Sequence, residues 1–424
     1  AAARYRDAAR ADLAAAKDSA VRPLAIARRA RLLVRLGDPG AAEALAGFAQ
    51  TFPSDTAAPS ALYALADMLG ERGDPAGAAR WFGDLIARYP ADLRASMARF
   101  RLAAQAVRDS LPDSAAALFR AEVAANGSQR LAARFWLGKL ALLAGDSAAA
   151  RATWLALVRE DSIGYYGLRA RREVPLAPLR IAAAPLPPPP PPVAASLGRL
   201  DTLVLAGLDS AAQVEVRAIL GRAPQQDVDA LLAWSDGLAL RGFGPAAVRL
   251  GWQAALKSPA DPRVLRAIFP WPHRGTVEAE AAEFGVDPLL LVAIVRQESV
   301  FDAAALSPAG ARGLAQLLPG TAALTARGLD VTFYPDWITV PDLNLHLGAA
   351  HLEELLRRFG DRVEVAAAAY NAGVAPVLRW LGRPGAADPD AFIELIPYLE
   401  TRGYVRSVLR NRELYRALYV APSN

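Results

Sequence analysis

The chain has 424 residues, 53% of them hydrophobic, and carries a net charge of +5 that comes almost entirely from arginine. It contains no cysteine, which excludes disulfide bonds and thiolate metal sites, and no run of about 18 apolar residues predicts a transmembrane helix. Because no block of about five or six like charges occurs, we interpret the positive excess as a scattered, solvated surface.

Alanine and leucine dominate the sequence, and β-branched runs are scarce. Since both residues are good helix formers, the composition predicts an all-α protein, and the length predicts two or three domains. The first residues, Ala1 to Arg6, lack the apolar core of a signal peptide, which leaves the cellular compartment open.

The first part of the chain carries a repeated turn signal that separates segments of helical hydrophobic periodicity. Its copies are Gly37-Asp38-Pro39, Gly73-Asp74-Pro75, Pro112-Asp113-Ser114 and Gly145-Asp146-Ser147. The aspartates lie 36, 39 and 33 residues apart, close to the ~34 residues of helix-pair repeats. An Asp or Ser before a helix caps its free N–H groups. The pattern predicts an α-superhelix over residues 1–180, similar to degenerate tetratricopeptide repeats, as either a concave binding surface or a frame.

A proline-rich segment, Pro185 to Pro192, interrupts the helical pattern. Such a run favours extended polyproline II and is incompatible with helix, so we predict a semi-rigid linker over 181–198 in preference to a partner-recognition motif. A helical linker domain is expected over 199–270. Pro270-Trp271-Pro272 breaks the chain again, and we place the start of the last domain, 271–424, there.

The dipeptide Asp287-Pro288 has the composition of a helix start, with Asp as the cap and Pro in the first turn. Leu291 and Val295 precede Glu298 by seven and three residues, which puts Glu298 on the apolar face at the C-terminal end. Burial and the helix dipole both raise the pKa of a carboxyl there, as protonation of a glycosidic oxygen near neutral pH requires. From this helix alone, a Glu that pairs with an Arg or faces water is the simpler interpretation.

Four short motifs in this last region favour the catalytic interpretation of Glu298 instead. They are Glu298-Ser299, Gly313-Leu314-Ala315-Gln316-Leu317-Leu318-Pro319, Ala369-Tyr370-Asn371-Ala372-Gly373 and Glu400-Thr401-Arg402-Gly403-Tyr404-Val405. Their order and spacing closely resemble the soluble lytic transglycosylases, whose catalytic domain is goose-lysozyme-like. The resemblance covers about Trp271 to Ala417 in detail. It extends more loosely upstream, because soluble members of that family carry an α-superhelix and a helical linker domain before the catalytic domain.

The resemblance implies a peptidoglycan lytic transglycosylase that cleaves the β-1,4 bond between N-acetylmuramic acid and N-acetylglucosamine without consuming water. It implies that Glu298 first protonates the oxygen that leaves C1. Glu298 then deprotonates the C6 hydroxyl of the same muramoyl sugar, and the product ends in a 1,6-anhydro sugar. This chemistry needs one carboxyl group because the nucleophile is already tethered to the substrate.

The resemblance also implies roles for other residues of the site. Tyr370 matches a tyrosine near the catalytic acid that helps to hold the cationic intermediate, and Ser307 matches a serine that contacts the muramoyl sugar. Gln316 matches a groove-lining amide that can bind N-acetyl groups. Asn371 is expected to bind backbone near the active-site helix. Glu400 matches a glutamate that lines the groove, although a salt bridge with Arg402 is an equally good interpretation.

Two positions depart from the family's signature, since Ala315 and Leu318 stand where it has methionine. Both changes keep an apolar wall and alter the fine fit to the substrate. The three histidines, His273, His346 and His351, do not share a helix face at the spacing of a metal site, so we expect no metal and no cofactor.

The resemblance further implies a place in the periplasm or cell envelope, with peptidoglycan glycan strands and not nucleic acid as the partner. The helical repeats would contact cell-wall synthesis or division proteins.

Two other functions stay open from the sequence. A lysozyme-like hydrolase on the same fold would need a second carboxylate, for which Asp302 and Glu400 are candidates, and would leave a reducing end. A non-catalytic scaffold would only bind glycan. The presence of Glu298, Gln316 and Tyr370 argues against the scaffold, and turnover of purified sacculi separates the two.

Overall fold

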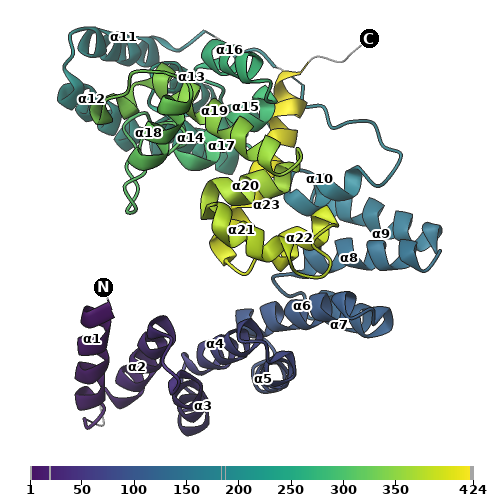
Figure 1. Cartoon of the computed structure of the whole chain (residues 1–424). Coiled ribbons are helices and arrows are strands. Elements are labelled where there is room, and N and C mark those ends of the chain that lie inside the picture. The colour runs from purple at the N-terminus through teal and green to yellow at the C-terminus, as the bar shows by residue number, and fades with distance from the viewer. Residues whose placement is uncertain (1, 19–20, 183, 187, 421–424) are drawn as a thin grey trace. The chain divides into compact units, whose positions relative to one another are not determined.

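The computed structural model describes residues 2–18, 21–182, 184–186 and 188–420. Every regular element within these ranges is a helix, and β-type pairing is limited there to isolated bridges in one loop. The all-α fold class is therefore confirmed. The chain packs as two compact units, unit 1 (Ala1–Pro175) and unit 2 (Leu176–Asn424), whose helices are labelled in Figure 1.

Unit 1 is a row of helices in which each helix packs against the next one in the sequence, the arrangement of a solenoid (Figure 1). The helices are α1 (Ala2–Ala15), α2 (Arg22–Leu36), α3 (Ala41–Thr51), α4 (Ala58–Glu71), α5 (Pro75–Arg88), α6 (Leu93–Arg108), α7 (Pro112–Ala124), α8 (Arg130–Leu143), α9 (Ser147–Glu160) and α10 (Tyr165–Arg171).

Two of the repeated aspartates cap helices as the sequence predicts. Asp74 accepts a hydrogen bond from Gly77 N and Asp146 accepts one from Ala149 N. Asp113 differs, because it lies inside the first turn of α7, where Pro112 is the first residue. Proline is favoured at that position, since its fixed φ suits a helix and the missing N–H would have no partner there.

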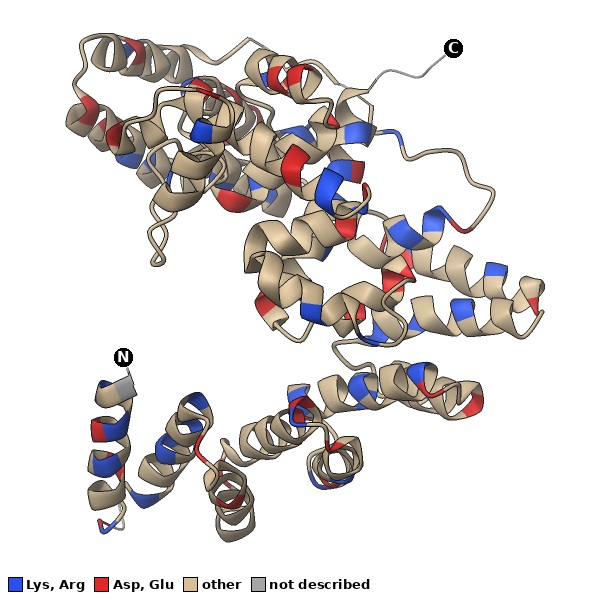
Figure 2. Ribbon diagram, viewed as in Figure 1, with Lys and Arg blue, Asp and Glu red and all other residues tan. Residues whose placement is uncertain are grey.

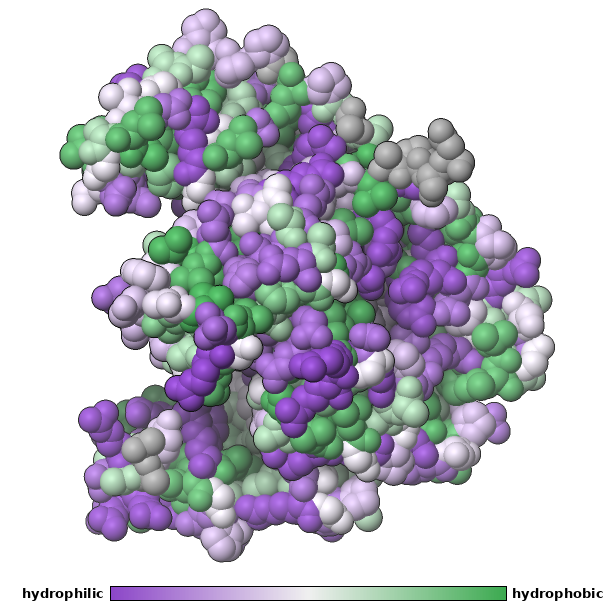
Figure 3. Space-filling model, turned by 45° about the horizontal axis from the view of Figure 1, so that its top comes forward, coloured by the Kyte–Doolittle hydropathy of each residue, from purple (hydrophilic) through white to green (hydrophobic). Residues whose placement is uncertain are grey.

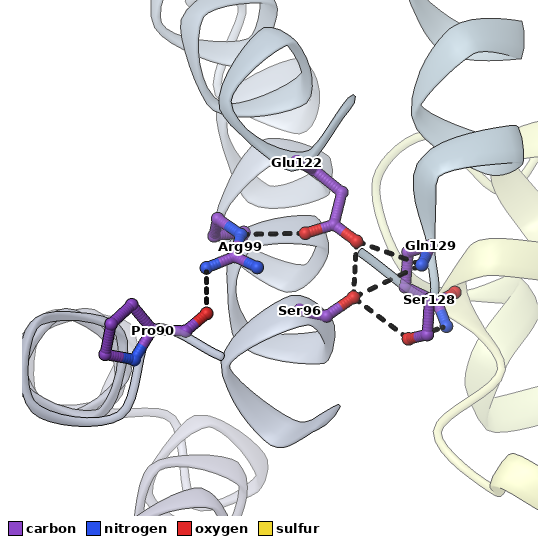
Figure 4. A network of polar contacts seen from close by, with 6 residues as sticks. All are labelled: Pro90, Ser96, Arg99, Glu122, Ser128 and Gln129. Carbon is purple, nitrogen blue, oxygen red and sulfur yellow. Dashed lines mark hydrogen bonds and ion pairs between the residues drawn. The ribbon is translucent and has the colours of Figure 1, made fainter. Parts of the chain in front are cut away.

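A buried ion pair and its hydrogen-bond partners link α6, α7 and the residue before α8 in unit 1 (Figure 4). Glu122 of α7 is fully buried and accepts hydrogen bonds from Arg99 Nε at 2.7 Å, from Ser96 Oγ and from Gln129 N at 2.9 Å. Arg99 of α6 also donates to the carbonyl of Pro90 at 3.3 Å. Both carboxylate oxygens thus have partners, as a charge removed from water requires.

Unit 2 contains the remaining helices. Those before residue 271 are α11 (Pro191–Leu205), α12 (Asp209–Arg222), η1 (Ala223–Gln225), α13 (Val228–Leu240), α14 (Gly244–Lys257) and α15 (Arg263–Ile268). Those after it are α16 (Arg274–Phe284), α17 (Pro288–Glu298), α18 (Pro319–Gly328), η2 (Pro335–Thr339), α19 (Pro341–Arg358), α20 (Val363–Ala372), α21 (Val374–Leu381), α22 (Pro389–Leu395) and α23 (Leu399–Tyr419).

The expectation that the proline run to Pro192 is wholly extended is wrong at its end. Pro190 has extended backbone, with ψ of 148°, and caps α11, which begins at Pro191. Prolines can open a helix because the first N–H groups have no intrahelical partners to lose. The division at 270 also falls inside unit 2, so the four-part division into 1–180, 181–198, 199–270 and 271–424 stays a prediction.

The core of unit 2 around the site is the packing of α17 against α23. Residues 289 to 295 of α17 are all buried, and Val405 and Val408 of α23 are fully buried opposite. Asp287 caps α17 through Leu289 N, and its other oxygen accepts a hydrogen bond from Arg412 of α23 at 2.6 Å. The N-terminus of the helix is thereby fixed to α23.

The surface is mixed in character. Figure 2 shows Lys and Arg interspersed with Asp and Glu along the helices of both units, as the sequence predicts. On the face drawn in Figure 3, hydrophobic and hydrophilic residues are intermingled. Among the described residues, no helix combines the length and the hydropathy needed to cross a membrane.

Candidate active site

Glu298 is the last residue of α17, at the end of its buried face. Burial raises the pKa of Glu298 from its ordinary value of 4.5 to about 7, against the opposing effect of a hydrogen bond from Tyr404. That bond runs from the Tyr404 hydroxyl to Glu298 Oε1 over 2.6 Å. The side chain can therefore exchange a proton near neutral pH, which is the property expected of a general acid and base.

Tyr404 is a site residue that the sequence reasoning did not single out, although it stands in the last motif. It lies one turn into α23, on the face that packs against α17. Burial and the negative charge of Glu298 raise the pKa of Tyr404 well above its ordinary value. Its hydroxyl therefore keeps its proton and remains a donor to Glu298.

Tyr370 approaches the same carboxyl from α20. Its hydroxyl donates to the carbonyl of Ala315 at 2.8 Å, and burial together with the charge of Glu298 raises its pKa well above the ordinary value. Tyr404 interacts electrostatically with both Glu298 and Tyr370, so the structure brings the three side chains together. The ring of His351 lies 5.4 Å from that of Tyr370.

The backbone directly after Glu298 turns sharply. Val300 and Phe301 have φ of 54° and 65°, a left-handed conformation that is costly for side chains other than glycine and rare for a β-branched residue such as valine. Ser299 holds this corner, because its hydroxyl donates to Leu314 O at 2.8 Å and accepts from Phe301 N at 3.1 Å. The end of α17 is thus tied to the loop that carries the second motif.

That loop, residues 305–317, is fixed by one buried amide. Asn344 of α19 is fully buried, accepts from Ala315 N at 2.7 Å and donates to the carbonyls of Ile338 at 2.7 Å and Arg312 at 3.2 Å. With the bond from Tyr370 to the Ala315 carbonyl, both polar backbone atoms of Ala315 are engaged. The loop is therefore a rigid wall beside Glu298.

Two predicted substrate-binding residues lie in this loop and also shape it. Ser307 accepts from Ala311 N through its hydroxyl at 3.0 Å, which closes a tight turn. Gln316, with φ of 49°, donates both amide hydrogens to backbone, to Ala305 O at 3.0 Å and Gly313 O at 2.9 Å. What Gln316 can offer a sugar is consequently the acceptor Oε1.

The other two predicted binding residues lie on opposite sides of the contact between α20 and α23. Asn371 Oδ1 accepts a hydrogen bond of 2.7 Å from Thr401 Oγ1, so this side chain joins the two helices that carry the tyrosines. Glu400 is exposed in the first turn of α23. Arg402 is buried and donates to the carbonyl of Glu394, so its side chain is directed away from solvent.

The two departures from the motif have different environments. Ala315 is fully buried in a cluster with Leu317, Ile338 and Leu347. Its side chain therefore points into the core and does not face solvent. Leu318 is 46% exposed.

A cavity of about 510 Å³ lies between α18 and α19 and is lined by His351, but by none of the predicted site residues. In addition, potential ligand atoms of Glu280, Glu283 and His346 lie within 4.8 Å of one another, on α16 and α19. His346 Nδ1 and Glu280 Oε2 are 2.8 Å apart and already pair with each other. The expected absence of a metal stays a prediction.

Comparison with known families decides which domain this site belongs to. Residues 275–393 match the family described as transglycosylase SLT domain. This part of unit 2 therefore resembles an SLT domain. The matched range contains Glu298 and Tyr370, and Tyr404 follows it on α23.

Individual relatives agree with the SLT assignment. Over 128 residues, the chain is 42% identical to the soluble lytic murein transglycosylase of Salmonella typhimurium and 41% identical to that of Escherichia coli K12. Each alignment covers 30% of this chain and 20% of the relative. The sequence match thus spans about a fifth of the length of these relatives, and over this domain the resemblance to the family is confirmed.

Solved structures extend the likeness beyond the SLT domain. The lytic transglycosylase Slt of Pseudomonas aeruginosa, solved as an inactive mutant in which Gln replaces a Glu, is 29% identical with a TM-score of 0.70. The 70 kDa soluble lytic transglycosylase of Escherichia coli is 23% identical with a TM-score of 0.74 and shows the shared fold. Each comparison covers 93% of this chain and 62% of the other.

Proposed function

We propose that this protein is a lytic transglycosylase that cleaves peptidoglycan glycan strands between N-acetylmuramic acid and N-acetylglucosamine, with Glu298 as acid and then base. The observation that carries the proposal is a buried carboxyl with a pKa of about 7, bonded by Tyr404 and flanked by Tyr370. The names of the relatives that match the SLT domain support the reaction and the substrate.

In the first step, protonated Glu298 gives its proton to the glycosidic oxygen as the bond from that oxygen to C1 of the muramoyl sugar breaks. Because burial raises the pKa of Glu298 to about 7, the protonated form is available near neutral pH. The carboxylate left behind accepts the hydrogen bond from Tyr404. Its negative charge, close to Tyr370, favours the positive charge that develops at C1.

In the second step, the Glu298 carboxylate takes the proton of the C6 hydroxyl of the same sugar while that oxygen bonds to C1. The product carries a 1,6-anhydro ring, Glu298 is protonated again, and no water is consumed. A single carboxyl suffices because the attacking hydroxyl belongs to the substrate and is already close to C1.

The surrounding residues would hold the glycan in place. We assign Gln316 Oε1 and the Ser307 hydroxyl to sugar groups beside Glu298, and Glu400 to the rim of the groove. Asn371 would act through Thr401, by keeping α20 and α23 in register. With this substrate, we expect the protein to act in the periplasm or cell envelope.

The test is mass spectrometry of the muropeptides released from purified sacculi. We expect 1,6-anhydro products from the unaltered protein and a loss of at least about 100-fold in Glu298→Gln, which keeps the shape but has no proton to give. Glu43→Gln, on the exposed first turn of α3, is the matched control. Products with reducing ends would identify a hydrolase, and release of nothing by the unaltered protein would contradict catalysis altogether.

A further inference from the structure

We infer that α14 and α15, which precede the SLT domain in the chain, act as a brace that positions Glu298. This inference rests on the proposed role of Glu298. Two contacts from these helices reach the chain at residues 296 and 300, two positions before and two positions after the glutamate.

The first contact is made by Arg296, in the last turn of α17. Its Nε and Nη2 donate to the carbonyl of Ile268 at 3.3 and 3.1 Å, and its guanidinium lies 5.5 Å from the centre of the Phe269 ring. Ile268 is the last residue of α15. A cation is favoured there because the carbonyls at a helix C-terminus have no intrahelical partner and carry partial negative charge.

The second contact is made by Gly244, the first residue of α14, which is buried. A Cβ at this position would overlap the carbonyl oxygen of Val300 and lie 2.9 Å from Cβ of Phe301. The helix can therefore approach the left-handed corner at 300 and 301 only with glycine at its start. Unfavourable backbone of this kind persists where the surroundings hold it in place, and α14 supplies that support.

The two contacts belong to one rigid body. Gly251 of α14 packs so closely on α15 that a Cβ there would lie 2.8 Å from the carbonyl carbon of Ala267. Ser235 of α13 donates to Ala247 O of α14 at 2.9 Å and joins the third helix to the pair. The brace thus holds α17 at 296 and the corner at 300 at fixed positions, and with them the 2.6 Å bond between Glu298 and Tyr404.

The direct test is Gly244→Ala in the full chain, with Gly221→Ala as the control. Gly221 lies in the last turn of α12, and a Cβ there meets nothing within 4 Å. We expect Gly244→Ala to displace the corner, lower kcat about 100-fold and leave KM little changed, because a misplacement of about 1 Å has an effect of that size. Gly221→Ala should keep full activity.

A readout that does not need turnover is the titration of the Glu298 carboxyl by NMR with ¹³C-labelled glutamate, assigned by its absence in Glu298→Gln. The groups that face Glu298 are Tyr404 of α23 and Tyr370 of α20. In Gly244→Ala water should reach the carboxyl and its pKa should fall from about 7 toward the ordinary 4.5. An unchanged kcat and an unchanged titration in this variant would overturn the brace.

If circular dichroism shows that Gly244→Ala does not fold, the brace is tested by comparing Arg296→Lys with Arg296→Met. Lysine retains one hydrogen bond to Ile268 O, so its kcat and titration should lie between those of the unaltered protein and Arg296→Met. Equal, undisturbed values in both variants would contradict the inference. A titration that shifts while the unaltered protein releases no anhydro product would refute the proposed function and leave the brace standing.

Discussion

At the scale of single residues, the proton affinity of Glu298 results from two opposed effects. Burial at the end of α17 disfavours the charged form, and the hydrogen bond from Tyr404 favours it. Burial is the larger effect, so the pKa lies near 7. In the mechanism proposed above, Glu298 is first an acid and then a base, and such a pKa suits both roles because both protonation states are populated near neutral pH.

Tyr404→Phe separates these two effects. Removing the donor withdraws the one effect that lowers the pKa of Glu298, so the pKa should rise above about 7. Because the first step needs protonated Glu298, activity falls as pH rises through this pKa, and in the variant that fall should move to higher pH. We also expect the maximal rate to decrease about 10-fold, since the carboxylate loses a charge-assisted hydrogen bond.

The measurement is the pH profile of anhydromuropeptide release, with Tyr334→Phe as the control. Tyr334 lies in the same domain and is 55% exposed. A profile of Tyr404→Phe that shifts to lower pH would show that the tyrosine does not stabilise the charged carboxylate.

Some of these site residues could be predicted from the sequence, and the roles of others could not. Glu298 and Tyr370 stand in short motifs whose order carries the resemblance. Tyr404 stands in such a motif too, but its role depends on the packing of α17 against α23, which joins residues 106 positions apart. No local pattern encodes that contact. The backbone bonds of Gln316 were likewise not predictable, because they follow from the left-handed turn at that residue.

At the scale of elements, side chains from three other segments of unit 2 hold the loop of residues 305–317. Asn344 on α19, Tyr370 on α20 and Ser299 at the end of α17 each bind its backbone. Under the proposed function, a loop fixed in this way presents Gln316 and Ser307 to the glycan without reordering. This lowers the entropic cost of binding.

Asn344→Ala should disturb this loop more than any single exposed substitution. It leaves Ala315 N without its buried partner and removes two donor bonds, so we expect a loss of about 3 kcal/mol in the free energy of unfolding. Activity should fall in parallel, since the wall beside Glu298 loosens. Urea denaturation and muropeptide release measure the two effects, with Gln213→Ala, at an exposed position of α12, as the control. A stability equal to that of the control would contradict this account.

The boundaries of elements were predictable where one residue type dominates the choice. Asp287 and Pro288 start α17 as expected, because capping and the fixed φ of proline act in the same direction. The prediction that the proline run is extended up to Pro192 was wrong, because proline favours both an extended chain and a first helical turn. What settles the choice at Pro191 is the apolar helix that follows, whose Val193 and Leu200 pack into unit 2.

At the scale of the whole molecule, both units are held by apolar helix packing, and unit 1 adds a buried ion pair to it. Unit 2 has the apolar contact of α17 with α23, and unit 1 has helices with many buried alanines. The ion pair between Arg99 and Glu122 joins α6 and α7, which also pack through the rings of Phe100 and Phe119 at 5.5 Å. The helix-pair pattern predicted the solenoid, but a Glu and an Arg 23 residues apart gave no sign of pairing inside it.

Glu122→Ala should lower the stability of unit 1 by about 3 to 5 kcal/mol, because it leaves Arg99 buried without its anion. Thermal unfolding of the full chain followed by circular dichroism measures the change, and Glu43→Ala, at an exposed position of α3, is the control. The catalytic titration of Glu298 in unit 2 should be unaffected. A variant as stable as the control would mean that the ion pair contributes nothing beyond its own desolvation.

The segment that enters unit 2 is bonded to the segment that leaves it. Ile181 N donates to Ala417 O at 3.1 Å, and Arg180 Nη1 donates to Val420 O at 2.6 Å. Chain entry and exit therefore share one corner of this unit, as in modules that tolerate insertion into another chain. Two neighbouring peptide junctions therefore suffice to insert this unit into another chain. The brace around Glu298 lies entirely within the unit and would be transferred with it.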